Sequence, residues 1–197
     1  MTAHPATSIP SHRASLQTFI VALHLACALF SATAIGAPPT DFTVQSPSDG
    51  KAFTLSSARG RFVALHFLLK TECPYCLKHT HDYAVKSAST PDVTHVFLKP
   101  DSADEIKAWA AKANTADAAH KVPVYRDPEA RLAAQFDIPN GYAFHGQIVH
   151  FPALIILDPS GKEVFRYIGK NNSDRFTFEQ FTAKLAELKR APSRSSP

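Results

Sequence analysis

The segment that most constrains the fold is an apolar run, Phe62–Leu69, that ends shortly before a Cys-x-x-Cys pair at Cys73 and Cys76. The run is interrupted only by His66, and it is short enough for a strand that is buried on both faces of a sheet. Pro74 suits the first turn of a helix, where its missing N–H costs nothing. The pattern therefore predicts a buried strand, a short turn and a helix that begins at the cysteine pair.

The predicted helix gives the cysteine pair its chemistry. Cys73 would lie at the helix N-terminus, where unpaired N–H groups and the helix dipole favour a thiolate over a thiol. Cys76 follows three residues later on the same helix face, within disulfide reach. We interpret the two cysteines as a redox pair in which Cys73 attacks a partner disulfide and Cys76 resolves the mixed disulfide. An inert pair of cysteines is the alternative without chemistry.

The first 34 residues look like a removable export signal. Phe19–Phe30 is apolar apart from His24, and Ala32–Ala34 has the small-x-small pattern of a signal-peptidase site. This apolar segment is shorter than a typical membrane-spanning helix. The alternative to cleavage is that the segment stays on the protein as an N-terminal membrane anchor. We therefore predict a signal peptide at residues 1–34, a mature chain that begins at Ile35, and an exported, periplasmic protein.

Removal of this segment simplifies the remaining chain. Of three cysteines only the Cys73–Cys76 pair would remain, in a compartment that permits disulfides. The segment carries one basic and no acidic residue, so the net charge falls from +4 to +3. This mild, unclustered charge argues against a nucleic-acid partner. We expect one domain at residues 35–190 and a disordered tail at residues 191–197.

The order of predicted elements indicates a layered α/β fold with helices on both faces of a mixed sheet. Two short N-terminal strands precede the apolar run, and two capping boxes, at residues 102–105 and 177–180, begin later helices. Residues 140–150 are expected to form a loop rich in aromatic and histidine residues. After the run, strands are predicted at Val93–Leu98, Val122–Tyr125, Ala153–Leu157 and Glu163–Ile168.

This order, together with three local motifs, resembles the thioredoxin superfamily, and the best match is the exported TlpA-like or redoxin-like thiol–disulfide oxidoreductases. The motifs are the Asp-Gly-Lys at residues 49–51, the Cys-Pro-Tyr-Cys at residues 73–76, and the segment Pro152–Lys162. The resemblance implies a thioredoxin-like fold with an N-terminal β extension. It also implies that Cys73 is the attacking thiolate, that Cys76 resolves, and that a cis peptide at Phe151–Pro152 faces the disulfide.

Residues next to the pair are expected to tune the thiolate. Lys70 should lower the pKa of Cys73, as should Lys78, whereas the carboxylate of Glu72 should raise it. Pro74 and Tyr75, between the cysteines, resemble the glutaredoxin motif.

His66 and a group of aromatic residues each allow two interpretations. His66 either handles the proton of Cys76, since a histidine pKa suits a proton shuttle, or is a core histidine bonded to a carbonyl. Tyr142, Phe144 and Phe151 either line a substrate groove beside Pro152 or pack over the sheet. The expected partners are protein disulfides or dithiols and a membrane electron donor. We expect a monomer without a bound cofactor or metal ion.

Two other functions are compatible with the motif. A copper-binding metallochaperone could use both thiolates and a nearby histidine, since soft thiolates suit Cu(I). His79 and His81 would not both help, because they point about 200° apart on a helix. A thiol peroxidase of the same fold is the second alternative. Thiol peroxidases have Thr or Ser three residues before the reactive cysteine, and Lys70 occupies that position here.

Overall fold

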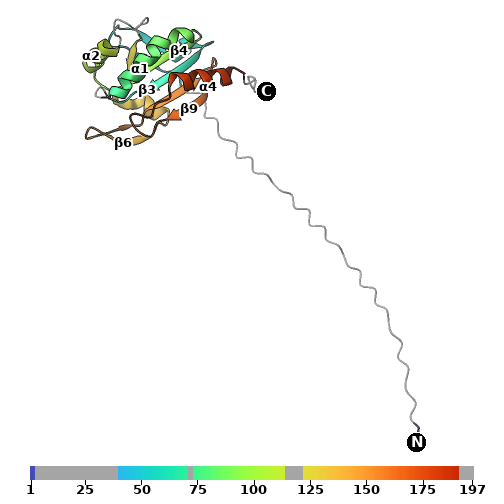
Figure 1. The fold of residues 1–197 in the computed structure, drawn as a ribbon. Coiled ribbons are helices and arrows are strands. Elements are labelled where there is room, and N and C mark those ends of the chain that lie inside the picture. The colour runs from blue at the N-terminus through green and yellow to red at the C-terminus, as the bar shows by residue number, and fades with distance from the viewer. Residues whose placement is uncertain (3–39, 71–72, 114–121, 191–197) are drawn as a thin grey trace. The chain divides into compact units, whose positions relative to one another are not determined.

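The computed structural model describes residues 1–2, 40–70, 73–113 and 122–190, and those from residue 40 onward form one α/β unit (Figure 1). Its strands are β1 (Thr43–Gln45), β2 (Ala52–Thr54), β3 (Phe62–Phe67), β4 (Val93–Lys99), β5 (Val124–Arg126), β6 (Asn140–Phe144), β7 (Gln147–His150), β8 (Ala153–Leu157) and β9 (Glu163–Ile168). Its α-helices are α1 (Pro74–Lys86), α2 (Ala103–Ala113), α3 (Arg131–Gln135) and α4 (Phe178–Arg190). Single 3₁₀ turns are η1 (Leu55–Ala58), η2 (Ser87–Ser89) and η3 (Pro128–Ala130).

Seven strands form one mixed sheet in the order β2-β1-β5-β4-β3-β8-β9. The predicted buried strand is confirmed as β3, which lies at the centre, parallel to β4 and antiparallel to β8. Leu65 is paired with Val96 on one side and with Ile155 on the other. The predicted N-terminal β extension is the β1–β2 hairpin, which joins the sheet through β5.

Alternate residues of β3 point into two separate cores, as the period of a strand requires. Ala64 belongs to the core under α1, α2 and α4, whereas Leu65 belongs to the core under α3 and η1. Helices therefore cover both faces of the sheet, and the predicted thioredoxin-like α/β class is confirmed. His66 points to the same face as Ala64, toward α1.

Both predicted capping boxes are present. The backbone N–H of Ser102 donates to a carboxylate oxygen of Glu105 (2.9 Å), and the N–H of Glu105 donates to the Ser102 hydroxyl (3.4 Å). Thr177 and Gln180 exchange the same pair of hydrogen bonds, at 2.8 and 3.2 Å. These contacts fix where α2 and α4 begin, because they satisfy N–H groups that a helix start leaves unpaired.

The predicted loop at residues 140–150 is wrong, since this segment is the β-hairpin of β6 and β7 (Figure 1). The two strands are joined at His145 and Gly146, both of which have positive φ (47° and 75°). Such a turn matches the twist of antiparallel strands, and a glycine adopts it without strain. A loop is predicted here because the segment is rich in aromatic and histidine residues, and that composition does not identify the turn at His145 and Gly146.

Several predictions lie outside the described residues. These are the signal peptide at residues 1–34, which includes the third cysteine, Cys27, and the tail at residues 191–197. Within the described ranges, no helix is long and apolar enough to cross a membrane.

Candidate active site

The cysteine pair lies where the sequence predicts it, at the start of α1. Cys73 is the N-cap residue and Pro74 occupies the first helical position. The sulfur of Cys73 accepts the backbone N–H of Cys76 at 3.1 Å, and the two cysteines form a disulfide with their Cα atoms 5.3 Å apart. A helix N-terminus stabilises negative charge, so it favours the thiolate that Cys73 carries after reduction.

The sulfur of Cys76 contacts the backbone segment that follows β3. The N–H of Leu69 donates to Cys76 Sγ at 3.3 Å, and the carbonyl of Leu69 accepts from Lys99 Nζ at 2.5 Å. Lys99 is fully buried, lies 3.4 Å from a carboxylate oxygen of Asp101 and stands 4.6 Å from the centre of the Trp109 ring. A buried cation therefore anchors the peptide that contacts the resolving sulfur.

Arg175 is the functional residue that sequence reasoning missed. Its Nη2 atom lies 3.4 Å from Cys73 Sγ and 3.1 Å from Cys76 Sγ, and its Nε donates to the carbonyl of Asn172 at 2.9 Å. Burial lowers the pKa of Arg175 to about 10, which still leaves a cation at neutral pH. Its position after β9 gives no local signal, because only the folded chain brings it to the cysteines.

The reactive sulfurs are covered in this state. Cys73 is 1% exposed and Cys76 is 0% exposed. A partner disulfide can reach Cys73 only after side chains around it move, and Arg175 is one such side chain.

The predicted tuning residues are only partly placed at the sulfurs. The carbonyl of Lys70 accepts the N–H of Cys73 at 3.1 Å, whereas Glu72 lies outside the described residues. Tyr75 is 46% exposed on the outer side of α1. Lys78 pairs with Asp82 at 2.6 Å on the helix surface. The cation in contact with both sulfurs is therefore Arg175, from a part of the chain that the tuning argument did not consider.

His66 is fully buried, but its partners are neither a carbonyl nor a cysteine. Its Nδ1 lies 2.9 Å from Nε2 of His79, and its Nε2 lies 3.1 Å from Nδ1 of His95. The expected core position of His66 is therefore confirmed, whereas the expected carbonyl partner is wrong. The strand pattern predicted the burial of His66, but the two other histidines come from α1 and β4.

The predicted cis peptide at Phe151–Pro152 is also wrong, because no cis bond occurs in the described ranges. This segment runs from β7 directly into β8. The N–H of Phe151 donates to the carbonyl of Pro139 (2.9 Å), and the carbonyl of Pro152 accepts from Gly169 (2.8 Å). These bonds hold an extended backbone in the trans form, which X-Pro bonds favour by about 0.5–1 kcal/mol. Pro152 borders a small cavity that His79 and Arg175 also border.

The three predicted groove residues form an aromatic group on the hairpin. Tyr142 packs against Phe144 (ring centres 6.1 Å apart) and against Phe151 (5.4 Å). Phe144 is 4% exposed and belongs to the core, so for this residue the groove alternative is wrong and the packing alternative holds. The hydroxyl of Tyr142 accepts the N–H of Asn172, in the loop that carries Arg175. This group therefore supports the loop of Arg175.

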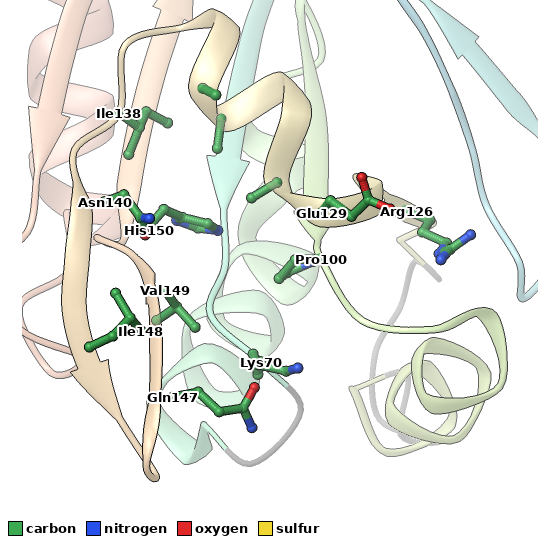
Figure 2. A pocket seen from close by; sticks show the side chains of 13 residues that line it. Lys70, Pro100, Arg126, Glu129, Ile138, Asn140, Gln147, Ile148, Val149 and His150 are labelled. Atoms are coloured by element: carbon green, nitrogen blue, oxygen red, sulfur yellow. The ribbon is translucent and has the colours of Figure 1, made fainter.

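An open pocket of about 440 Å³ lies beside β7 of the hairpin (Figure 2). All four residues of β7 line it, together with residues of α3 and with Lys70. Figure 2 shows Lys70 and Gln147 at one end of the pocket and Ile138 at the other. Ile148 is 64% exposed in this wall. Because Lys70 precedes Cys73 by three residues and bonds to its N–H, the pocket adjoins the cysteine segment.

The alternative of a copper site finds no donor set in the described part of the chain. There, no group of three or more His, Cys, Asp or Glu side chains is placed to hold a metal ion.

A family model matches residues 35–164, and its description is the AhpC/TSA family. The chain belongs to the AhpC/TSA family. The match spans β1 through the start of β9 and includes both cysteines and the hairpin. No curated protein sequence matches the chain.

Solved structures confirm the fold of this AhpC/TSA member. Enterococcus faecalis AhpC has a TM-score of 0.65 at 18% identity, covering 83% of this chain and 96% of its own. The Xanthomonas campestris bacterioferritin comigratory protein, described for alkyl peroxide reduction, has a TM-score of 0.60 at 19% identity (79% and 94% covered). A secreted Mycobacterium tuberculosis disulfide oxidoreductase homologous to E. coli DsbE has a TM-score of 0.55 at 18% identity (75% and 96%).

The family and the Cys73–Cys76 disulfide make this chain an oxidoreductase with thiol–disulfide redox chemistry. The redox pair that the sequence predicted is thereby supported, and the fold neighbours include both peroxide-reducing and disulfide-exchanging proteins.

Proposed function

We propose that this protein exchanges thiols and disulfides with partner polypeptides. The observation that carries the proposal is the Cys73–Cys76 disulfide at the N-terminus of α1 with the guanidinium of Arg175 on both sulfurs. The reduced pair has two sulfurs within bonding reach, and a helix end and a cation both stabilise the thiolate form. This arrangement stores two electrons and releases them to a disulfide.

The chemistry runs in two steps. The Cys73 thiolate attacks one sulfur of a partner disulfide, forms a mixed disulfide and releases the other partner sulfur as a thiolate, which takes a proton from solvent. Cys76 then loses its proton and attacks Cys73 Sγ, which closes the Cys73–Cys76 bond and releases the second partner thiolate. The partner gains two electrons, and the pair loses two electrons and the one thiol proton of Cys76, since Cys73 already reacts as a thiolate; the released partner thiolates take their protons from solvent.

The pocket beside the pair supports a polypeptide partner. Its wall is the short strand β7, whose residues all line the pocket, and an extended segment can add to the edge of such a strand. Exposed Ile148 would contact an apolar side chain of that segment. Lys70 and Arg126, also on the wall, favour a partner segment that carries an acidic residue.

A surface variant tests this partner class. We expect Ile148→Asp to lower kcat/KM for a protein disulfide such as insulin and to leave the rate with a small disulfide such as glutathione disulfide unchanged. Val85→Asp is the matched control, because Val85 is also exposed (43%) but lies on α1, away from the pocket. An equal loss with both substrates would contradict docking at β7.

We also propose that the protein works as an exported, periplasmic monomer fed by a membrane electron donor. The support is the apolar segment and the small-x-small pattern of residues 1–34, together with one redox pair that an oxidising compartment would otherwise keep closed. Mass spectrometry of the processed protein should give Ile35 as the first residue. An intact Met1, or a lipid on Cys27, would overturn the proposed export route.

Thiol peroxidase activity is the second candidate, because one fold neighbour is described for alkyl peroxide reduction. One preparation of the full chain should be assayed for insulin reduction, hydrogen peroxide consumption and copper stoichiometry. We expect insulin reduction to dominate. Cys73→Ser should abolish it, whereas Cys76→Ser should accumulate mixed disulfides with partners. Peroxide consumption that survives in Cys76→Ser, without insulin reduction in the parent, would assign the peroxidase function instead.

A further inference from the structure

Three histidines from three different elements form one hydrogen-bonded row beneath α1, which we call the histidine row. The row is His79 of α1, His66 of β3 and His95 of β4, with ring nitrogens 2.9 and 3.1 Å apart. It ends at the Thr90 hydroxyl, 3.3 Å from Nε2 of His95. Both nitrogens of His66 are used within the row, and the residue is 0% exposed. Such a row is costly to bury unless every donor meets an acceptor.

Burial keeps the row uncharged. Burial lowers the pKa of His79 to about 3, with the cation of Arg175 and His95 adding to the effect, and it lowers the pKa of His95 to about 4. The pKa of His66 is also well below its usual value, again mainly through burial. The rings of Tyr83 and Phe97 pack around these histidines and supply no charge to stabilise an imidazolium. Each ring therefore carries one N–H and one acceptor nitrogen at neutral pH.

The proton positions in the neutral row follow from its end. The Thr90 hydroxyl donates its one hydrogen to the carbonyl of Ser87 (3.1 Å), so it accepts from Nε2–H of His95. Nδ1 of His95 is then an acceptor, and Nε2–H of His66 donates to it. By the same logic Nε2–H of His79 donates to Nδ1 of His66. All three rings carry the proton on Nε2, and Nδ1 of His79 is left as the acceptor at the head of the row.

The two ends of the row open in different directions. His79 follows Cys76 by one helical turn and borders a cavity of about 10 Å³, the size of one water molecule. Arg175, which contacts both sulfurs, borders the same cavity. At the other end His95 is mostly buried but keeps an exposed fraction, so the row runs from beside the cysteine site toward the surface.

We propose that the histidine row is the path by which the proton of Cys76 leaves and returns during exchange, an inference that rests on the proposed thiol–disulfide function. When Cys76 attacks Cys73, its thiol proton reaches Nδ1 of His79 by way of water in the cavity, which neither cysteine lines but which Arg175, in contact with Cys76 Sγ, borders together with Asp174. Nε2–H of His79 then passes to His66, and Nε2–H of His66 passes to His95. Nε2–H of His95 passes to the hydroxyl oxygen of Thr90, and Thr90 gives up its own hydroxyl hydrogen, which turns from the Ser87 carbonyl toward solvent. One proton enters, one leaves, and no ring keeps a charge.

The row resets itself in the second half of the cycle. After one passage all three rings carry the proton on Nδ1. When an electron donor reduces the disulfide, Cys76 leaves as a thiolate and takes a proton back from Nδ1 of His79. The row then fills from its solvent end, and every ring regains Nε2–H. Because oxidation and reduction move the proton in opposite directions, no ring needs to rotate inside the packed core.

The clearest test is a substitution at His95, the far end of the row. Among the described residues, His95 forms hydrogen bonds to His66 and Thr90 and to neither sulfur, so its replacement leaves the contacts of the sulfurs in place. Reduced protein is mixed with 5,5′-dithiobis(2-nitrobenzoate), and release of the yellow thiolate is followed by stopped flow. The first phase reports attack by Cys73 and the second reports resolution by Cys76. We expect His95→Ala to slow the second phase at least about tenfold, since positioned proton transfer contributes about 10²–10⁴-fold.

Chemical rescue separates a proton path from a packing role. Added imidazole should restore the second phase in His95→Ala, because it has a donor and an acceptor nitrogen. N-methylimidazole should not restore it, because its methyl group leaves one acceptor nitrogen and no N–H donor. His95→Phe, which fills the space beside Phe97, should stay folded and slow. His81→Ala, half-exposed on the same helix as His79, is the control.

Each outcome has one meaning. An unchanged second phase in folded His95→Phe, or equal rescue by both imidazoles, would overturn the proton path and leave the exchange function standing. Absence of any thiolate release from the reduced parent protein would overturn the exchange function itself. Loss of the solvent deuterium isotope effect on the second phase of His95→Phe would support the path.

Discussion

Arg175 and Cys76 are 99 residues apart in the chain, yet the guanidinium Nη2 lies 3.1 Å from the sulfur. The same atom lies 3.4 Å from Cys73 Sγ, so one cation serves both halves of the redox pair. A cation this close favours whichever sulfur carries the negative charge at each step of exchange. It also covers the disulfide, and its movement is part of partner entry.

Removal of this cation should raise the pKa of the Cys73 thiol. An opposite charge within 4–6 Å shifts a pKa by about 1–3 units, so we expect Arg175→Gln to raise the Cys73 value by about 1 unit or more. The pH dependence of iodoacetamide alkylation of the reduced protein measures it. Lys78→Gln is the control, because Lys78 pairs with Asp82 on the surface. Identical alkylation profiles for Arg175→Gln and the parent would refute the role of Arg175.

Gly169 should be required for the placement of Arg175. A Cβ at residue 169 would meet the carbonyl oxygen of Asp174 and come within 3.0 Å of Cγ of Pro152. We expect Gly169→Ala to cost about 1–3 kcal/mol of unfolding free energy, as overpacking does, and to slow alkylation of Cys73 by displacing Arg175. Urea unfolding and alkylation rates measure the two effects. Lys170→Ala, exposed at the next position, should change neither.

Lys99 should stabilise the backbone under the resolving sulfur. Its Nζ donates to the carbonyl of Leu69, whose N–H contacts Cys76 Sγ. We expect Lys99→Met to lower the free energy of unfolding by about 1.5–3 kcal/mol, the usual worth of a hydrogen bond to a charged group. Lys107→Met, which removes an exposed ion pair with Asp104, should cost less than about 1 kcal/mol. Equal losses of unfolding free energy in the two variants would show that the buried Lys99 contact stabilises the fold no more than an exposed ion pair does.

The histidine row should make the fold sensitive to acid. The pKa values of His79 and His95 in the folded chain (about 3 and about 4) lie below the unfolded value of about 6.5. The unfolded state therefore binds more protons between these limits, and stability falls as pH drops from about 6.5 toward 4. Above about pH 6.5 these histidines add no pH dependence.

A variant can assign this slope to the row. Each such histidine contributes at most about 1.4 kcal/mol per pH unit, so His95→Asn should flatten the slope near pH 5 by about that amount. Urea unfolding at pH 7, 6, 5 and 4.5 measures it. A His95→Asn slope equal to that of the parent would count against neutral burial of His95.

The local order of the chain could be predicted from the sequence because its signals are local. The apolar run at β3, the capping boxes at Ser102 and Thr177, and Pro74 after Cys73 each act on neighbouring residues through burial or hydrogen bonding. The redox pair was therefore placed correctly at the start of α1. The hairpin at residues 140–150 was missed because its turn depends on positive φ at His145 and Gly146 within an aromatic stretch.

What surrounds the pair was decided by tertiary structure alone. Arg175 arrives from the loop after β9, and His79 and His95 reach His66 because α1 lies across β3 and β4. No spacing in the chain encodes these contacts, since they depend on which strands are neighbours and which face each helix covers. The trans peptide bond before Pro152 was also decided by tertiary structure, because hydrogen bonds to Pro139 and Gly169 hold the backbone of Phe151 and Pro152. The sequence by itself determined the two sulfurs and their helix, and the folded sheet determined the cation and the histidines that act on them.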